Sequence, residues 1–165
     1  MKKGMSIALA ALAVILPTAS SAQHKDVNVQ SQNTVTASSG LISPESKTVI
    51  DLVNAERKKL GLRVLRENVK LSRAAQRKAN DMNTKQYWAH TSPVGLKGWD
   101  FIRKEKYLYE TAGENLAMGF SAHEEAVNAW MTSPSHRTNI LDRGFVETGV
   151  GIVSGVYEGK PTFFI

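Results

Sequence analysis

The stretch AGENLAMGFSAHEEAVNAWMTSPSHRTNIL, residues 112–141, carries most of the chemistry that this sequence suggests. Glu114 lies in a Gly-Glu-Asn turn, and His136 follows Ser133-Pro134-Ser135. That tripeptide predicts a helix start, because serine caps helices and proline fits the first helical position. A histidine in the first turn should be neutral, because the positive end of the helix dipole disfavours imidazolium. Neutral imidazole is the form that binds metals or accepts protons.

A second histidine, His90, lies upstream in the segment YWAHTSP, residues 87–93. We expect it just beyond the end of a helix, on a loop held by flanking aromatic side chains. Loops on rigid scaffolds are where site residues tend to lie. His90 and His136 are far apart in the sequence, so spacing alone does not bring them together.

The first 22 residues predict a secretory signal peptide with cleavage after Ala22. Lys2 and Lys3 precede the apolar run 7–16, and small residues follow at 19–22. The apolar run is too short to span a membrane. Because the chain has no cysteine for lipid attachment, we expect a released, soluble product, extracellular or periplasmic. We also expect a monomer.

Residues 23–43 are rich in Ser, Gln, Asn and Thr, which is typical of a flexible tether, and the folded domain should occupy 44–165. Without residues 1–22 the chain keeps 19 basic and 15 acidic residues, a net charge of +4. These charges are scattered, so we expect no nucleic-acid partner. With no cysteine, no disulfide stabilises the fold, which must rest on its core, alone or with a bound metal.

Helices should come first and strands last. Apolar residues at helical spacing, Val49, Leu52, Val53 and Leu60, predict a helix up to Gly61. An alanine-rich helix from about Asn68, a short amphipathic piece at 99–107 and a helix capped by a reciprocal Ser121/Glu124 box should follow. Alternation over 146–156, a turn at 158–159 and a strand at 162–165 predict a closing antiparallel hairpin. This order indicates an α+β fold rather than repeated βαβ units.

Several motifs follow one another as in one known family. They are Asn54-Ala55-Glu56-Arg57, the alanine-rich helix ending before His90, Gly113-Glu114-Asn115-Leu116-Ala117, the run from Trp130 to Leu141, and Gly149-Val150-Gly151-Ile152. In this order the chain resembles bacterial members of the CAP superfamily, the SCP-like extracellular proteins, over residues 45–165. The resemblance implies a three-layer α-β-α sandwich with a central cleft. It also implies a last strand, ending at Ile165, that is shorter than in bacterial relatives.

In better-known relatives the cleft holds two histidines and two glutamates, and the resemblance assigns His90, Glu114 and His136 to three of these positions. The fourth, a glutamate in eukaryotic relatives, is here Ser133, and Glu125 should point elsewhere. Two imidazoles and one carboxylate could hold a divalent ion, zinc rather than calcium, with open positions for water. The lost second acid weakens the case for a hydrolase, because Glu114 is the remaining candidate base.

Other interpretations stay open. The three residues could form a buried hydrogen-bonded cluster that fixes the loops, and Ser92 or Ser135 could belong to a Ser-His-Glu triad, although neither has a nucleophile-elbow context. Asn54, Arg57 and Asn139 look like structural ties. Asn115 could join the cleft or satisfy the turn backbone. The three tryptophans favour the core, and Tyr107 and Tyr109 could belong to core or site.

Three functions therefore remain. The first is a secreted binding protein whose His90/Glu114/His136 cleft takes a metal ion and an envelope or extracellular ligand. The second is a metal-dependent extracellular hydrolase, with Glu114 as the candidate catalytic residue. The third, suggested by lipid binding among eukaryotic relatives, is a carrier of lipid or another apolar ligand.

Overall fold

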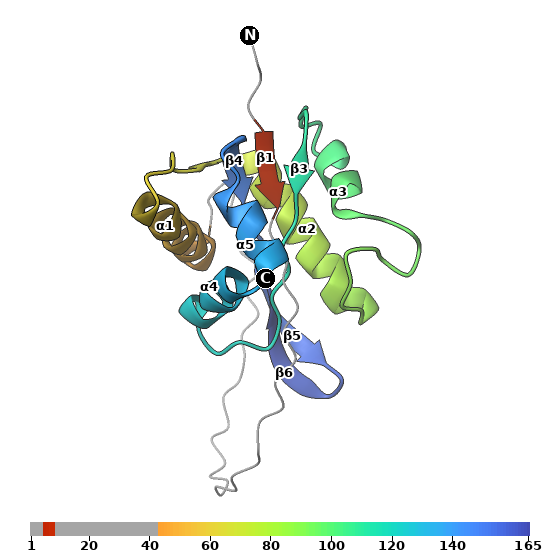
Figure 1. Ribbon diagram of the computed structural model, residues 1–165. Coiled ribbons are helices and arrows are strands. Elements are labelled where there is room, and N and C mark those ends of the chain that lie inside the picture. Colours follow the sequence, from red (N-terminus) through yellow and green to blue (C-terminus); the bar gives the residue numbers. More distant parts are fainter. Residues whose placement is uncertain (1–4, 9–42) are drawn as a thin grey trace, which may run out of the picture.

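The computed structural model describes residues 5–8 and 43–165, so the predictions of a signal peptide and a tether fall largely outside the described residues. Helices and strands alternate irregularly along the chain (Figure 1). The helices are α1 (Pro44–Lys59), α2 (Val69–Lys85), α3 (Gly98–Lys104), α4 (His123–Thr132) and α5 (Pro134–Leu141). The strands are β1 (Met5–Ala8), β2 (Arg66–Glu67), β3 (Ala112–Gly113), β4 (Phe145–Gly149), β5 (Val153–Tyr157) and β6 (Lys160–Phe164).

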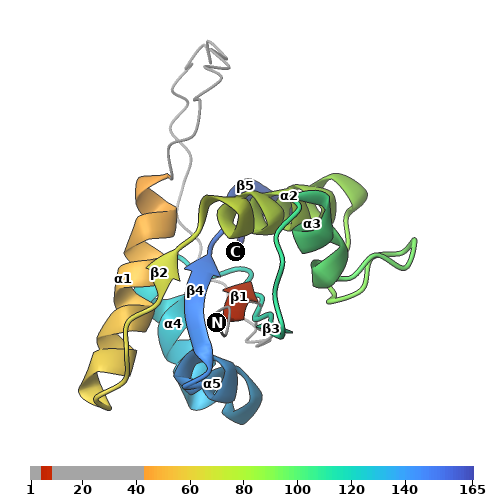
Figure 2. The ribbon, with the colours of Figure 1, turned by 90° about the horizontal axis from the view of Figure 1, so that it is seen from above.

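Two helical layers enclose a small sheet, as Figure 2 shows from above. Helices α2 and α3 lie on one side of the sheet, and α1, α4 and α5 lie on the other. The sheet has the order β2-β4-β1-β3, with all three neighbouring pairs parallel, and β5 and β6 form a separate antiparallel hairpin. The predicted α+β class, the α-β-α layering and the C-terminal hairpin are confirmed.

Strand β1 was not predicted. It lies within the segment that the sequence assigns to a signal peptide, yet its backbone occupies an inner position of the sheet. It pairs with β3 at Ser6 and Ile7 and with β4 along its whole length. Residues 1–4 and 9–42, which hold the rest of the signal peptide and the tether, lie outside the described residues.

Helix α1 begins as predicted, with Ser43 as its cap and Pro44 in its first turn. Its buried face carries Val49, Ile50 and Val53. The prediction that Leu60 shares this face is wrong, because the helix ends at Lys59 and Leu60 is 49% exposed.

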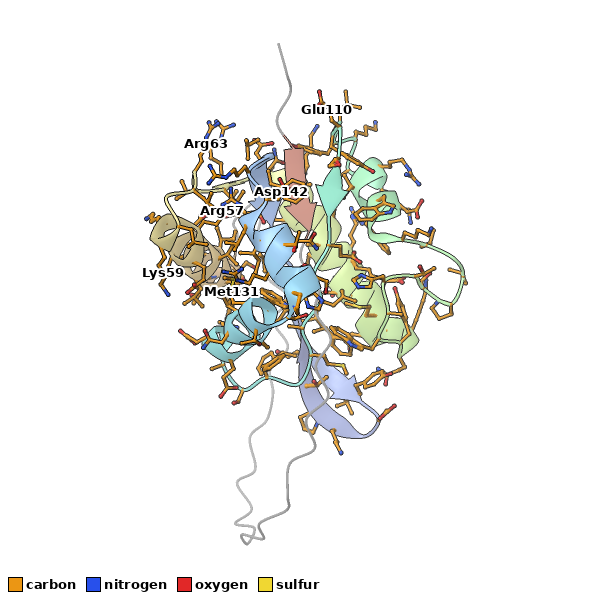
Figure 3. The ribbon with its side chains drawn as sticks, viewed as in Figure 1. Arg57, Lys59, Arg63, Glu110, Met131 and Asp142 are labelled. Carbon is orange, nitrogen blue, oxygen red and sulfur yellow. The ribbon has the colours of Figure 1, made fainter. Side chains whose placement is uncertain are left out.

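Arg57, on α1, is fully buried and acts as a structural tie. Its guanidinium donates to the carbonyls of Arg63 (2.8 Å), Ile140 (2.7 Å) and Asp142 (2.9 Å). Figure 3 shows Arg57 and Asp142 side by side, where the end of α5 meets α1. Asn54 completes this junction by pairing with both backbone groups of Leu65. The predicted structural roles of Asn54 and Arg57 are confirmed.

Helix α2 packs very closely on the segment that follows β4. A Cβ at Gly149 would overlap the backbone between Leu71 and Ser72, and one at Gly151 would overlap the backbone at Gln76. Backbone atoms on both sides cannot move apart cheaply, so only glycine fits at either position. The small alanines on α2 predicted close packing against another element, but not that these two glycines meet it.

Two local predictions need correction. The alternating run from Val146 to Val156 is two strands, β4 and β5, because residues 150–152 leave the sheet and pack against α2. Helix α4 starts at His123 with Ala122 as its cap, and the carboxylate of Glu125, not Glu124, accepts from the backbone and hydroxyl of Ser121.

Candidate functional site

His90 and Glu114 form a direct pair. The Nδ1 atom of His90 lies 2.7 Å from Oε1 of Glu114. A carboxylate oxygen accepts this hydrogen bond, so Nδ1 donates it, and Nε2 is the ring nitrogen that Glu114 does not contact. The His90 side chain is 61% exposed and that of Glu114 only 7%. The pair therefore presents an imidazole to solvent from a carboxylate anchored below it.

Glu114 is held by the backbone around it. Gly98, the first residue of α3, lies against its carboxylate, and a Cβ at that position would overlap Oε2. The observed position of the Glu114 carboxylate thus requires a residue without a side chain at position 98. The sequence gives no signal for this contact, because Gly98 is distant from Glu114 along the chain and is typical of a loop residue.

Lys78 is a residue of this site that sequence reasoning missed. It is 4% exposed, and its ammonium donates to the carbonyls of Ala89 (2.9 Å) and His90 (3.1 Å) and to the hydroxyl of Tyr87 (3.2 Å). Burial lowers the pKa of Lys78, while the negative charges of Glu114 and Asp81 oppose that shift. Lys78 therefore fixes the loop that carries His90 and adds a positive charge near Glu114.

His136 lies in the first turn of α5, as predicted. Ser133 occupies the N-cap position, but its side chain caps no backbone N–H. Instead its Oγ lies 2.6 Å from Nδ1 of His136. Ser133 thus contacts the histidine with a neutral hydroxyl.

The pKa of His136 is lowered, so the neutral form is favoured as predicted. The main cause is burial, and the nearby charge of His90 adds to it.

Two asparagines tie Glu114 to α5. The amide of Asn115, which is fully buried, donates to the carbonyl of His136 at 3.0 Å. Asn139 donates to Oδ1 of Asn115 at 2.7 Å and to the carbonyl of Glu114 at 3.4 Å. Asn115 therefore neither joins the cleft nor serves only its own turn: it places the Glu114 segment beside the His136 helix. Asn139 is a structural tie, as predicted.

A mostly apolar pocket adjoins Glu114 and Lys78. Its walls include Ala79, Met82 and Trp130, and its interior has room for about one water molecule. Trp130 is fully buried and donates from its indole to the carbonyl of Leu116. Trp88 and Trp99 pack against the core clusters, so the core assignment of the three tryptophans is confirmed.

Tyr107, Tyr109 and Ser92, which the sequence left as possible site residues, have structural contacts. Tyr107 donates to Glu147 at 2.5 Å and packs with Tyr109 against the core of α2 and α3. Ser92 accepts from the backbone of Leu96 and Ser135 is exposed. Among the described residues, the hydroxyl of Ser133 contacts His136, whereas the carboxylate of Glu114 contacts His90. No Ser-His-Glu triad is assembled in this part of the chain.

Over residues 5–8 and 43–165, no three side chains of His, Cys, Asp or Glu are placed as the ligands of one ion. The pairing of Glu114 with Nδ1 of His90 fits a different role for the carboxylate. In metal sites such a group orients the imidazole while Nε2 binds the ion. The structure shows two imidazoles, each with a protein partner at Nδ1.

Comparisons with known proteins agree with this fold. Residues 50–165 match the model of the CAP family, described as the cysteine-rich secretory protein family. The chain belongs to this family, although it has no cysteine. It is 40% identical over 132 residues to the uncharacterized protein YkwD of Bacillus subtilis, covering 80% of this chain and 51% of YkwD. The chain thus spans about half the length of that relative.

Two solved structures share the fold. An extracellular protein containing an SCP domain from Bacillus anthracis is 27% identical with a TM-score of 0.59, covering 76% of this chain and 44% of that one. An outer surface protein of Borrelia burgdorferi has a TM-score of 0.61 at 24% identity, covering 72% of this chain and 86% of that one. In the described residues of the present chain, no helix is long and apolar enough to cross a membrane.

Proposed function

We propose that this CAP domain is exported and that the imidazoles of His90 and His136 hold a divalent metal ion, zinc in the first place, which binds a ligand outside the cell or at its envelope. The observation that carries the proposal is the hydrogen bonding of the two imidazole rings. Each Nδ1 has a protein partner, Glu114 or Ser133, whereas within the described residues neither Nε2 has a hydrogen bond.

Chemistry supports zinc over calcium. Neutral imidazole nitrogen is a preferred zinc ligand, whereas calcium takes mainly oxygen. Two protein ligands leave coordination positions for water and for a carboxylate or amide oxygen of the ligand. His136 binds through Nε2 when its Nδ1–H donates to Ser133 Oγ, and burial keeps the ring neutral.

The site is expected to be a weak one. Lys78 places a buried positive charge near Glu114, and Ser133 supplies no negative charge where eukaryotic relatives have a carboxylate. Both features oppose a cation between the histidines. They favour an ion that a negatively charged ligand helps to hold, which fits a binding role.

Export is supported by the signal-peptide pattern of residues 1–22 and by relatives described as extracellular or outer-surface proteins. The two other functions have less support. A hydrolase would need Glu114 as its base, but that carboxylate is occupied by His90. A lipid carrier would need a larger cavity than the one beside Glu114.

Calorimetric titration with zinc tests the proposal, using wild type, His90→Ala, His136→Ala and the control His123→Ala. His123 is an imidazole at the start of α4 that has no part in the site. We expect a saturable heat in wild type and in the control, and about tenfold or greater weakening in the two site variants. No zinc-dependent heat or melting shift in wild type would overturn the proposal, as would equal weakening in the control.

A further inference from the structure

Helix α5 has two different faces. Its inner face carries His136 and Ile140, which is fully buried. Its outer face carries four residues that recur three and four positions apart, Pro134, Arg137, Thr138 and Leu141. Figures 1 and 2 show α5 at the outside of the molecule, on the far side of the sheet from α2. The candidate site described above uses the inner face of this helix.

A groove lies along the outer face of α5, and we call it the α5 groove. It has a volume of about 490 Å³ and is lined by Thr132, Pro134, Arg137, Thr138, Leu141 and Asp142. All of these residues except Leu141 are exposed, so the groove is open to solvent. Its volume lies within the range of sites for small organic ligands, about 300–1,000 Å³. A water molecule occupies only about 30 Å³, so the groove has room for a molecule and not just for an ion.

Arg137 and Asp142 bring opposite charges to the α5 groove without pairing with each other. Within the described residues, the guanidinium of Arg137 has no hydrogen bond or ion pair. Oδ1 of Asp142 accepts from the backbone N–H of Gly144 at 2.7 Å, which fixes the side chain and leaves Oδ2 outside this contact. Burial lowers the pKa of Arg57, and the nearby charge of Asp142 opposes that shift, but Arg57 donates to backbone carbonyls. The groove therefore holds one guanidinium and one carboxylate oxygen for a ligand.

The two threonines of the groove add acceptors. Oγ1 of Thr132 donates to the carbonyl of Ala129, and Oγ1 of Thr138 donates to the carbonyl of Pro134, both at 2.9 Å. A hydroxyl has a single hydrogen, so each of these oxygens can only accept a hydrogen bond from a ligand. The donors of the groove thus belong to Arg137, and its acceptors belong to the threonines and to Asp142.

We propose that the α5 groove binds a short peptide with both termini free, its carboxylate at Arg137 and its ammonium group at Asp142. Guanidinium binds a carboxylate through two parallel hydrogen bonds, and a carboxylate oxygen accepts from an ammonium group. The length of the groove selects the ligand. Residues 137 and 142 are separated by about 7.5 Å along a helix axis, and an extended dipeptide spans about 7 Å. An inorganic anion would use Arg137 alone and would be repelled by Asp142. The groove is a second binding site that needs neither the proposed export nor a metal ion.

The test uses the purified full chain without zinc, and the probe is the dipeptide alanyl-leucine. Binding is followed by NMR through the backbone amide signals of Thr132 and Thr138. Two blocked forms of the dipeptide serve as control ligands, one acetylated at its N-terminus and one amidated at its C-terminus. The protein variant is Arg137→Gln. Its matched control is Arg143→Gln, the same change at an exposed arginine that does not line the groove.

We expect saturable shifts of both threonine signals in wild type and in Arg143→Gln. Each blocked dipeptide should bind wild type at least about tenfold more weakly, and Arg137→Gln should weaken the free dipeptide by a similar factor, because one charged contact is lost. In Arg137→Gln, amidation of the C-terminus should cost no further affinity, since both changes remove the same contact.

The absence of a saturable shift in wild type would overturn the proposal. Equal binding of the acetylated and free dipeptides would also overturn it, because the groove would then be a site for anions alone. Equal weakening in Arg137→Gln and Arg143→Gln would do the same, because it would indicate a general effect of charge. Binding should be unchanged in His90→Ala, so the proposed metal site stands or fails separately.

Discussion

Ser133 Oγ lies 2.6 Å from Nδ1 of His136, and Ser133 is the residue for which the family resemblance implies a glutamate in eukaryotic relatives. The partner of this ring in the present chain is therefore a neutral hydroxyl. A carboxylate at Nδ1 raises the basicity of a ligating imidazole and fixes its tautomer, whereas a hydroxyl can either donate or accept. The two histidines of the site therefore differ: His90 has a charged partner and His136 a neutral one.

Replacing this hydroxyl by a carboxylate should strengthen metal binding. We expect Ser133→Glu to raise zinc affinity about tenfold, because a carboxylate fixes the Nδ1 proton of His136 and adds a negative charge. The matched control is Ser135→Glu, the same change at an exposed position two residues further along. Calorimetry measures both. Equal gains in the two variants would show a general charge effect and not a contact with His136.

Gly98→Ala should disturb the site more than the fold. The new methyl group overlaps Oε2 of Glu114, and the end of a glutamate side chain can move aside, so we expect Glu114 to leave His90. Zinc affinity should fall about tenfold with little change in melting temperature. In a Glu114→Ala background the same change should have no further effect on zinc binding. If the two substitutions reduced zinc affinity additively in the double variant, Gly98→Ala would not act through Glu114.

Lys78→Met should destabilise the loop that carries His90. It leaves the carbonyls of Ala89 and His90 without their buried donor, which costs about 1–3 kcal/mol in the free energy of unfolding. Lys85→Met, which removes an exposed partner of Asp81, should cost about 0.5 kcal/mol or less. Urea unfolding compares the two variants. A Lys78→Met protein as stable as wild type would mean that the ammonium does not hold this loop.

Stability should fall on mild acidification because of His136. Its pKa in the folded protein is below the ordinary value of 6.5, so the unfolded chain binds the proton more readily. The contribution is complete above about pH 6.5 and is lost as the pH falls through that value. His136→Asn should therefore show a smaller drop in its urea midpoint between about pH 7.5 and pH 5.5 than wild type. Identical drops in both proteins would rule out this histidine as the cause.

The fold was largely predictable because its local signals agree. Ser43-Pro44 and Asn68 mark helix starts, and the Glu158-Gly159 turn, with both residues at positive φ, joins β5 to β6. The division of one predicted strand into β4 and β5 was not predictable. It depends on Gly151 meeting the backbone of α2, a long-range contact that alternation does not reveal.

Lys78 was missed because a lysine on a helix is normally solvated. A signal was nevertheless present. Lys78 lies four residues after Ala74 and four before Met82, both on the buried face of α2, so helical spacing places it inside. Sequence likewise could not identify β1 as a strand, because two lysines before an apolar run favour a signal peptide, and the pairing partners of β1 lie more than a hundred residues away.

X-ray absorption at the zinc edge, on protein loaded with one equivalent of zinc, tests the central claim most directly. The account predicts scattering from two imidazole rings, with the remaining ligands oxygen, and the loss of one ring in either His90→Ala or His136→Ala. A spectrum with no imidazole, or one unchanged in both variants, would contradict a zinc site held by these two histidines.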